Sequence, residues 1–304
     1  MKKKLIISSL ILLVCCLQAS EVKGQKKDIL NNVDTLFKSI LESYKKEPIF
    51  IHKQFDMTDE EAIDIIDKMP SFGIFEDSYF VTGISTNHTP TRESSDAKFQ
   101  LSVRQRLSKS TLPFNTFAYF TYTQKSFWGI YAESSPFRDT NYNPGLGLGR
   151  YIIHNKKLIG SAFIQLEHES NGKDGDDSRS WNYLSVSGKY FFNPYLSFNL
   201  ELWLPYVDGG ENKDLLKYRG LGKFCINGVR SNSSFWYSGE INPRMGIGNT
   251  NINLSFGYRV SSRSNQYLYA QFYNGYGEGL LDYKQHHSFL RLGFCIKPSF
   301  DTIF

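Results

Sequence analysis

The sequence has few cysteines and, beyond its first residues, no long hydrophobic run. Two of its four cysteines fall within the first 20 residues, which leaves Cys225 and Cys295. Two cysteines are too few for a disulfide framework and form no paired metal-binding spacing, so we interpret them as inward-facing strand residues. After Leu17 no run of about 18 apolar residues occurs, which excludes a transmembrane helix. A membrane location would therefore require a closed β-barrel.

The chain also lacks a strong net charge once its first residues are set aside. Its formal charge is +5, and three lysines at positions 2–4 precede an apolar run at 5–17 and the small residues Ala19 and Ser20. This layout is typical of a cleaved secretory signal, which we place at residues 1–20. Removing the three lysines leaves 5 − 3 = +2, which is not the footprint of a nucleic-acid-binding protein.

Residues 21–78 are expected to form a helical lead-in on the periplasmic side. Apolar residues recur there at helical spacing, and Thr58-Asp-Glu-Glu61 predicts a capping box that opens a short helix ending before Pro70. The apolar positions of the first part are Ile29, Leu30, Val33, Leu36, Phe37, Ile40, Leu41 and Tyr44.

From residue 79 to residue 304 the hydrophobic period changes from helical to two. Leu200, Leu202 and Leu204 alternate with polar neighbours, which indicates an apolar outer face and a polar interior. The fold class predicted is all-β, a twelve-stranded antiparallel transmembrane barrel of the bacterial outer membrane, and terminal Phe304 resembles an outer-membrane insertion signal. The expected strands are 79–86, 97–107, 115–124, 140–150, 161–170, 182–191, 195–207, 217–230, 233–242, 251–261, 265–274 and 287–297.

Three polar residues break the apolar face of two neighbouring strands. His168 and Ser170 continue the parity of Leu166, and Asn182 continues that of Leu184. Residues two apart on a strand lie about 7 Å apart at their Cα atoms, so imidazole and hydroxyl can lean together. His168 would take the proton of Ser170, and the amide oxygen of Asn182 would orient the imidazole. This pattern predicts an enzyme that acts on a lipid.

These residues belong to motifs that strongly resemble the outer membrane phospholipase A family. The motifs are Tyr122-Thr-Gln-Lys-Ser126, Glu133-Ser-Ser-Pro-Phe-Arg-Asp-Thr-Asn-Tyr142, His168-Glu-Ser170-Asn171-Gly172, Ser178-Arg-Ser-Trp-Asn182 and Tyr273-Asn-Gly-Tyr-Gly-Glu278. The resemblance covers residues 79 to 304 and leaves out the helical lead-in. It implies a calcium-dependent phospholipase A1/A2 that is a homodimer when active, with Ser170 as nucleophile, His168 as base and Asn182 as orienting residue. Phospholipids would be its substrate and outer-membrane lipids its surroundings.

The resemblance also implies where the catalytic Ca2+ is held. Its ligands would be the carbonyl of Lys173, the hydroxyl of Ser178 and the carbonyl of Ser134 from the partner subunit. With a periplasmic amino terminus, the loops that carry Ser134 and Ser178 both open on the extracellular side. This chain departs from the family at Gly175, where the family tends to carry an acid, although the same loop contains three aspartates.

Two other functions are compatible with a barrel of this kind. A lipid A deacylase also uses His-x-Ser on a barrel surface, but with an acidic orienting residue and a smaller barrel, and Asn182 and twelve strands argue against it. A non-catalytic porin-like barrel would conduct ions and hydrolyse no ester. Gln124 lies either on the membrane face, where it could bond across a dimer, or inside the barrel.

Overall fold

The computed structural model describes residues 51, 58–206, 212–246, 248–261, 264–298, 300 and 302–304. Of the two compact units of the chain, Met1–Lys46 and Glu47–Phe304, only the second contains described residues. The expected signal at 1–20 and the helical repeat that begins at Ile29 lie outside them. No helix among the described residues has the length and hydropathy needed to cross a membrane.

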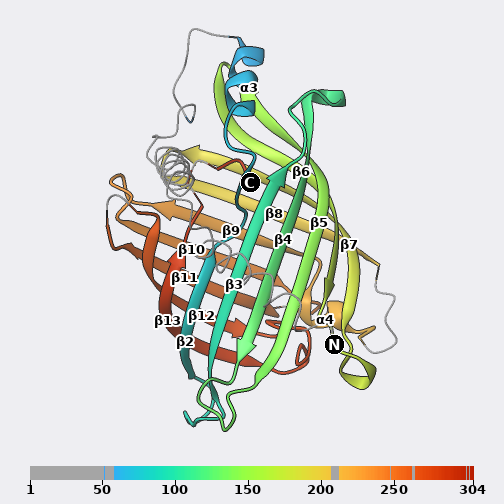
Figure 1. The fold of residues 1–304 in the computed structure, drawn as a ribbon, viewed down its shortest axis with the longest axis vertical. Coiled ribbons are helices and arrows are strands. Elements are labelled where there is room, and N and C mark those ends of the chain that lie inside the picture. Colours follow the sequence, from blue (N-terminus) through green and yellow to red (C-terminus); the bar gives the residue numbers. More distant parts are fainter. Residues whose placement is uncertain are drawn as a thin grey trace, which may run out of the picture. The chain divides into compact units, whose positions relative to one another are not determined.

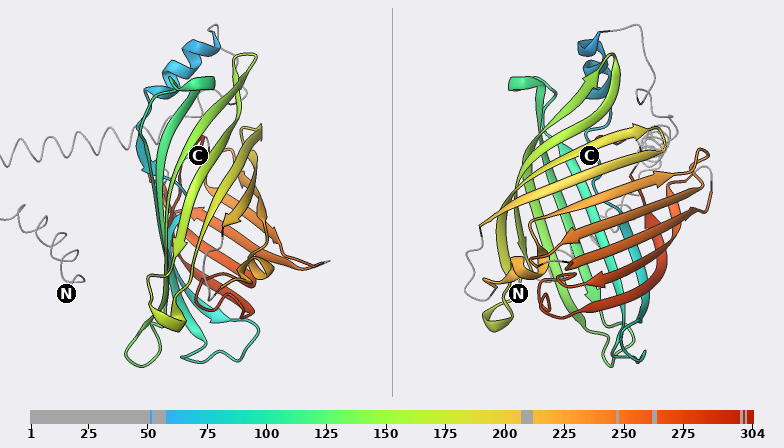
Figure 2. Two further views of the ribbon diagram at one scale, coloured as in Figure 1. Left: turned by 90° about the vertical axis from the view of Figure 1, so that its right-hand side faces the viewer. Right: turned by 180° about the vertical axis from the view of Figure 1, so that it is seen from behind.

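A closed antiparallel sheet of twelve long strands forms the second unit, as predicted. Each strand pairs with the next along the chain, and the last pairs with the first through contacts such as Leu292 opposite Thr82. Figure 1 follows the strands from blue β2 to red β13, which lies beside β2, and Figure 2 shows the same strands from the side and from behind. The strands are β2 (Ser78–Ser85), β3 (Ser95–Arg106), β4 (Thr116–Trp128), β5 (Phe137–His154), β6 (Lys157–Ser170), β7 (Ser180–Asn193), β8 (Leu196–Tyr206), β9 (Gly222–Val229), β10 (Phe235–Pro243), β11 (Thr250–Arg259), β12 (Gln266–Gly275) and β13 (His287–Ile296).

A thirteenth, short strand was not predicted. β1 (Phe72–Ile74) pairs with residues 103–105 of β3, whereas β2 pairs with residues 95–100 of the same edge. β1 therefore lies in line with β2 and adds no strand to the circumference. The turn between them carries Glu76 and Asp77, which face the barrel interior.

The barrel is apolar outside and polar inside. On β8 the side chains of Leu200, Leu202 and Leu204 are exposed, while Ser197 and Trp203 are buried. This alternation follows from the two-residue period of a strand and is the reverse of a water-soluble core. Cys225 and Cys295 are free thiols that face inward, as expected.

Charged side chains in the interior are neutralised in pairs. Arg291 contacts Asp96 at 2.8 Å and Glu278 at 2.7 Å, and Lys98 contacts Glu278 at 2.8 Å. All four side chains are at most 5% exposed. A buried charge is tolerated when it is paired and hydrogen-bonded, so this cluster ties β3, β13 and the loop after β12 together.

The helix α3 (Asp59–Asp67) begins at the predicted capping box. The Thr58 hydroxyl accepts from the Glu61 amide at 3.2 Å, and the Glu61 carboxylate accepts from the Thr58 amide at 2.7 Å. Arg106, at the end of β3, donates to the Ile66 carbonyl at 3.2 Å and to the Asp67 carbonyl at 2.6 Å. These bonds hold α3 at the barrel end where β3 finishes and β4 starts.

The terminal aromatic residue lies inside the barrel and does not close the last strand. β13 ends at Ile296, eight residues before Phe304. The Phe304 ring stacks on Phe163 at 5.3 Å and packs edge-on against Tyr119 at 5.4 Å. Lys189 Nζ donates to the Phe304 carbonyl at 3.1 Å. The tail thus folds back into the lumen at the end that also carries α3.

Candidate active site

His168 and Asn182 face each other across β6 and β7 on the outer surface of the barrel. They are directly opposite in the strand register, and His168 Nδ1 lies 2.8 Å from Asn182 Oδ1. An amide oxygen only accepts, so the imidazole donates from Nδ1 and leaves Nε2 free as an acceptor. His168 is exposed and Asn182 half-buried, as the parity of the two strands predicts.

Ser170 ends β6 on the same face, two residues after His168. It is half-buried and lies opposite Ser180 in the register. Among the hydrogen bonds of the described residues, none joins Ser170 to His168. Hydrogen bonds of a catalytic group are often long in a free enzyme and shorten only around the substrate. The three predicted residues therefore share one face, and two of them are in contact.

An apolar groove lies beside the imidazole on the outer wall. Residues from strands β4 to β8 line the groove. Its polar lining residues include His168, Asn182 and Glu167. Pro144 and Gly145 of β5 leave space for this groove because they carry little or no side chain. Its apolar lining consists of Phe120, Pro144, Leu146, Leu166, Leu184, Leu204 and the ring of Tyr206.

The loop between β6 and β7 is organised by the side chain of Asn171. Its amide nitrogen donates to the Asp177 carbonyl at 2.8 Å, and its amide oxygen accepts from the Arg179 amide at 3.0 Å. Gly172 and Gly175 have φ values of 62° and 58°, which a glycine adopts without strain. The left-handed conformation at Gly175 favours glycine over the acid that the resemblance leads one to expect at this position.

Oxygen donors suited to a hard cation are present in this loop. Within the part of the chain that the structure describes, neither the Ser178 hydroxyl nor the Lys173 carbonyl has a hydrogen-bond partner. The Lys173 ammonium is directed away, donating to the Arg138 carbonyl at 3.0 Å. Three exposed aspartates, Asp174, Asp176 and Asp177, flank the two donors. Carbonyl, hydroxyl and carboxylate oxygens are the ligands that Ca2+ prefers, so the donor set fits this ion.

Ser134 lies in the loop between β4 and β5, at the same end of the barrel as Ser178. The strands alternate in direction, so the ends of β4 and β6 share one rim, toward the lower end of Figure 1. Ser134 has a φ of 61°, and among the described residues no hydrogen bond joins it to the Lys173–Ser178 loop.

Gln124, left open by the sequence, faces the membrane side. Its amide oxygen accepts from the Tyr122 hydroxyl at 3.1 Å, and the intervening and following side chains of Thr123 and Lys125 line the lumen. No group of three or more His, Cys, Asp or Glu side chains that could hold a metal occurs in the described ranges. A metal site here would therefore depend on carbonyl and hydroxyl donors.

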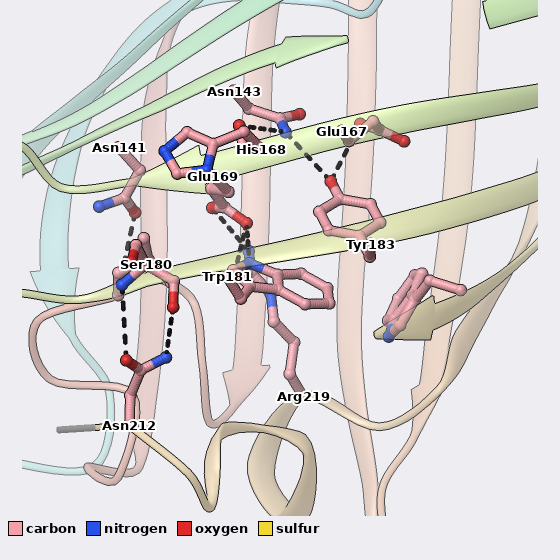
Figure 3. A network of polar contacts seen from close by, with 12 residues as sticks. Asn141, Asn143, Glu167, His168, Glu169, Ser180, Trp181, Tyr183, Asn212 and Arg219 are labelled. Carbon is pink, nitrogen blue, oxygen red and sulfur yellow. Dashed lines mark hydrogen bonds and ion pairs between the residues drawn. The ribbon is translucent and has the colours of Figure 1, made fainter. Parts of the chain in front are cut away.

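Sequence reasoning missed a second set of residues behind the site. Glu169, Trp181 and Arg219 lie on the lumen side of the same two strands, and Asn143 donates to the His168 carbonyl at 3.2 Å (Figure 3). Arg219 comes from α4 (Leu215–Arg219) in the loop after β8. The inward parity of Glu169 and Trp181 was visible in the sequence, but nothing there pointed to Arg219 as their partner.

Comparison with known proteins identifies a family. The family model described as Phospholipase A1 matches residues 76–296. The Phospholipase A1 of Salmonella typhimurium is 32% identical over 224 residues, which cover 71% of this chain and 75% of that protein.

Two solved structures are similar in fold. The Salmonella typhi outer membrane phospholipase dimer with bound calcium has a TM-score of 0.68 at 26% identity and covers 77% of this chain and 95% of that one. The outer membrane phospholipase A of Escherichia coli, as an active-site mutant with alanine in place of an asparagine, has a TM-score of 0.68 at 25% identity and covers 78% and 98%. The chain therefore belongs to the phospholipase A1 family and is a bacterial outer-membrane barrel enzyme that hydrolyses phospholipids.

Proposed function

We propose that this phospholipase cleaves acyl ester bonds by a Ser170-His168-Asn182 mechanism that depends on calcium and on a homodimer. The observation that carries the proposal is the 2.8 Å contact between His168 Nδ1 and Asn182 Oδ1 on the lipid-facing wall. Polar groups are costly on such a surface unless they have a task there. The solved Escherichia coli relative with an active-site asparagine replaced supports the role of Asn182.

Asn182 would fix the imidazole through Nδ1 and leave Nε2 free to accept the proton of Ser170. Ser170 Oγ attacks the ester carbonyl carbon while its proton passes to His168 Nε2. The bond from carbon to the lysophospholipid oxygen then breaks, and His168 returns the proton to that oxygen. A water molecule, deprotonated by the same Nε2, attacks the acyl-enzyme and releases the fatty acid with Ser170 restored.

The apolar groove beside His168 accommodates an acyl chain lying along the barrel wall. Its leucines on β5 to β8 exclude water from the chain, and their outward direction keeps the substrate within the lipid layer. The scissile carbonyl would then be near the rim, where Ser170 ends its strand. A phospholipid oriented along the bilayer normal meets this geometry without leaving the membrane.

Lys173 and Ser178 would hold the calcium ion next to Ser170 on the same loop. A calcium ion held by these residues would polarise the ester carbonyl and stabilise negative charge on its oxygen. The three neighbouring aspartates raise the local concentration of divalent cations. Ser134 of the partner subunit would complete the site, because the solved Salmonella typhi relative is a dimer with bound calcium.

A dimer would also supply the wall that a barrel surface lacks. The active site lies on an outer face, so a second subunit is needed to enclose the acyl chain and reaction centre. In this arrangement residues 1–20 would act as the export signal and residues 21–78 as a periplasmic lead-in. The surrounding outer-membrane lipids supply the substrate.

The proposal is tested by replacing Ser170. Ser170→Ala should abolish fatty-acid release from mixed micelles while leaving the barrel folded, because it removes one hydroxyl and little buried surface. A sulfonyl fluoride should label wild-type Ser170 and leave the variant unlabelled. Release of fatty acid by the folded variant at a near wild-type rate would refute the assignment.

A further inference from the structure

The two strands that carry the reacting groups are joined to each other on their lumen side. Glu169 lies between His168 and Ser170 and points inward, as does Trp181 next to Asn182. Glu169 and Trp181 are opposite each other in the register, and the Trp181 indole N–H donates to Glu169 Oε2 at 2.8 Å. Every polar residue of the outer site therefore has a buried, bonded neighbour on the inner face.

Arg219 completes this inner cluster from a distant part of the chain. Its guanidinium donates through Nη1 to Glu169 Oε2 at 2.7 Å and through Nη2 to Oε1 at 3.1 Å. The same guanidinium lies 5.5 Å from the centre of the Trp181 ring, which stacks on Tyr183 at 3.9 Å. Side-chain exposure is 16% for Arg219 and 9% for Glu169, so water screens the pair weakly.

The start of the same loop is hydrogen-bonded to Ser180, the residue before Trp181 on β7. Asn212 is fully buried, donates to the Ser180 carbonyl at 2.9 Å and accepts from the Ser180 amide at 3.5 Å. Ser180 is the partner of Ser170 across the two strands. Between Asn212 and Arg219, Leu215 packs into the cluster that contains Trp181. Figure 3 shows Asn212 and Arg219 approaching the two strands from one side.

We propose that residues 212–219 form a positioning element for the catalytic strands, with Arg219 and Glu169 as its positioning pair. The inference rests on the proposed roles of Ser170 and His168. Because strand side chains alternate, fixing Glu169 inward fixes the direction in which its two neighbours leave the wall. Neither Arg219 nor Glu169 touches the substrate, so both act through the setting of Ser170 and His168.

The proposal predicts a loss of turnover with little change in substrate binding. Arg219→Met should lower kcat about 10- to 100-fold, the loss expected for a reacting group displaced by about 1 Å, and change KM by less than about twofold. Arg219→Lys should be intermediate, since it keeps the charge but loses the two-point contact. In Glu169→Gln/Arg219→Met, kcat should fall no further than in the worse single variant.

A second buried arginine provides the matched control. Arg291 also makes a two-point contact with a carboxylate, that of Asp96, but on β13, far along the sheet order from β6. Arg291→Lys should lower the stability of the barrel and leave kcat per folded enzyme unchanged. The amount of folded protein is quantified from the mobility of unheated samples in gels. All rates are expressed per amount of folded protein. An equal loss of kcat in Arg291→Lys would overturn the proposal, because the effect would then be general.

Labelling of Ser170 separates this inference from the proposed function. The rate of labelling by a sulfonyl fluoride, without phospholipid present, should fall in Arg219→Met in parallel with kcat. Wild-type labelling rate and kcat in folded Arg219→Met would overturn the positioning role and leave the proposed function intact. Absence of labelling at Ser170 in the wild-type enzyme would instead refute the proposed function itself.

Discussion

At the scale of single residues, the distinctive feature of the site is a neutral third member. The Asn182 amide oxygen lies 2.8 Å from His168 Nδ1, and in the proposed mechanism it would orient the imidazole without a negative charge to stabilise the imidazolium. In the serine protease template, a third member that imposes the wrong tautomer costs on the order of 10⁴ in turnover. A neutral and partly exposed partner contributes less to that stabilisation.

The first prediction is that Asn182→Ala remains measurably active. We expect turnover to fall roughly 10- to 10³-fold, scaled down from the protease template, with Ser170→Ala and His168→Ala inactive. Turnover of the three variants on one micellar substrate at saturating calcium measures this order. A completely inactive Asn182→Ala in a folded barrel that still dimerises would show that its role is larger than orientation.

The second prediction distinguishes a side-chain ligand from a carbonyl ligand of calcium. Ser178→Ala should raise the calcium concentration needed for half-maximal activity, because the hydroxyl donor is removed. Ser134→Ala should have a smaller effect, since a backbone carbonyl survives the substitution. Calcium titrations of fatty-acid release compare the two variants, and an equal or reversed order would exclude Ser178 as a ligand.

The sequence was a good guide to residues whose direction follows from strand parity. His168, Ser170 and Asn182 were placed on the outer face because each continues an apolar stripe, and the structure places them there. Arg219 could not be found in this way, because 50 positions separate it from Glu169 and its loop has no recognisable motif. Gln124 required the structure, since the residues near the end of β4 no longer alternate strictly in polarity.

At the scale of elements, the carboxy-terminal tail is the least expected segment. Phe304 packs among the aromatic rings of β4 and β6, and the Arg104 guanidinium lies 4.1 Å from the centre of its ring. Ser161 donates to the Ile303 carbonyl and thereby holds the tail against β6. A terminal aromatic could be recognised in the sequence, but its return into the lumen depends on partners from four distant strands.

The third prediction is that this packing stabilises the barrel without contributing to catalysis. Phe304→Ala should lower the free energy of unfolding by about 1–3 kcal/mol, below the full cost of a buried phenylalanine because the ring is only half-buried. Urea titration of the refolded protein measures the change, and turnover per folded enzyme should be unaltered.

Phe114 offers a matched control at the same end of the barrel. Its side chain is 83% exposed, so Phe114→Ala should change the free energy of unfolding by less than about 0.5 kcal/mol. Equal effects of the two substitutions would mean that the tail packing contributes nothing specific.

At the scale of the whole molecule, the number and order of the strands could be predicted from the sequence. Each strand has its own alternation of apolar and polar residues with a period of two. All twelve expected segments overlap strands β2 to β13, but the segment expected at 217–230 begins too early, because residues 217–219 belong to α4 and β9 starts at Gly222. The interior was not predictable in the same detail, since pairs such as Arg291–Asp96 join residues nearly 200 positions apart. Closure of the sheet is what brings such residues together.

The last prediction concerns the link between calcium and assembly. If Lys173 and Ser178 of one subunit share an ion with Ser134 of the partner subunit, the ion is bound more tightly by the dimer than by the monomer. Calcium and dimerisation then stabilise each other by the same free energy, as linkage requires. Chelation should therefore stop turnover and raise the dimer dissociation constant together, and restored calcium should reverse both.

Turnover and oligomeric state are measured on the same micellar samples across a calcium titration. In the Ser178→Ala variant, the calcium midpoints of turnover and of dimerisation should shift in parallel. Equal activity in chelator and in excess calcium would refute the calcium requirement, whereas loss of activity with an unchanged dimer would place the ion within a single subunit.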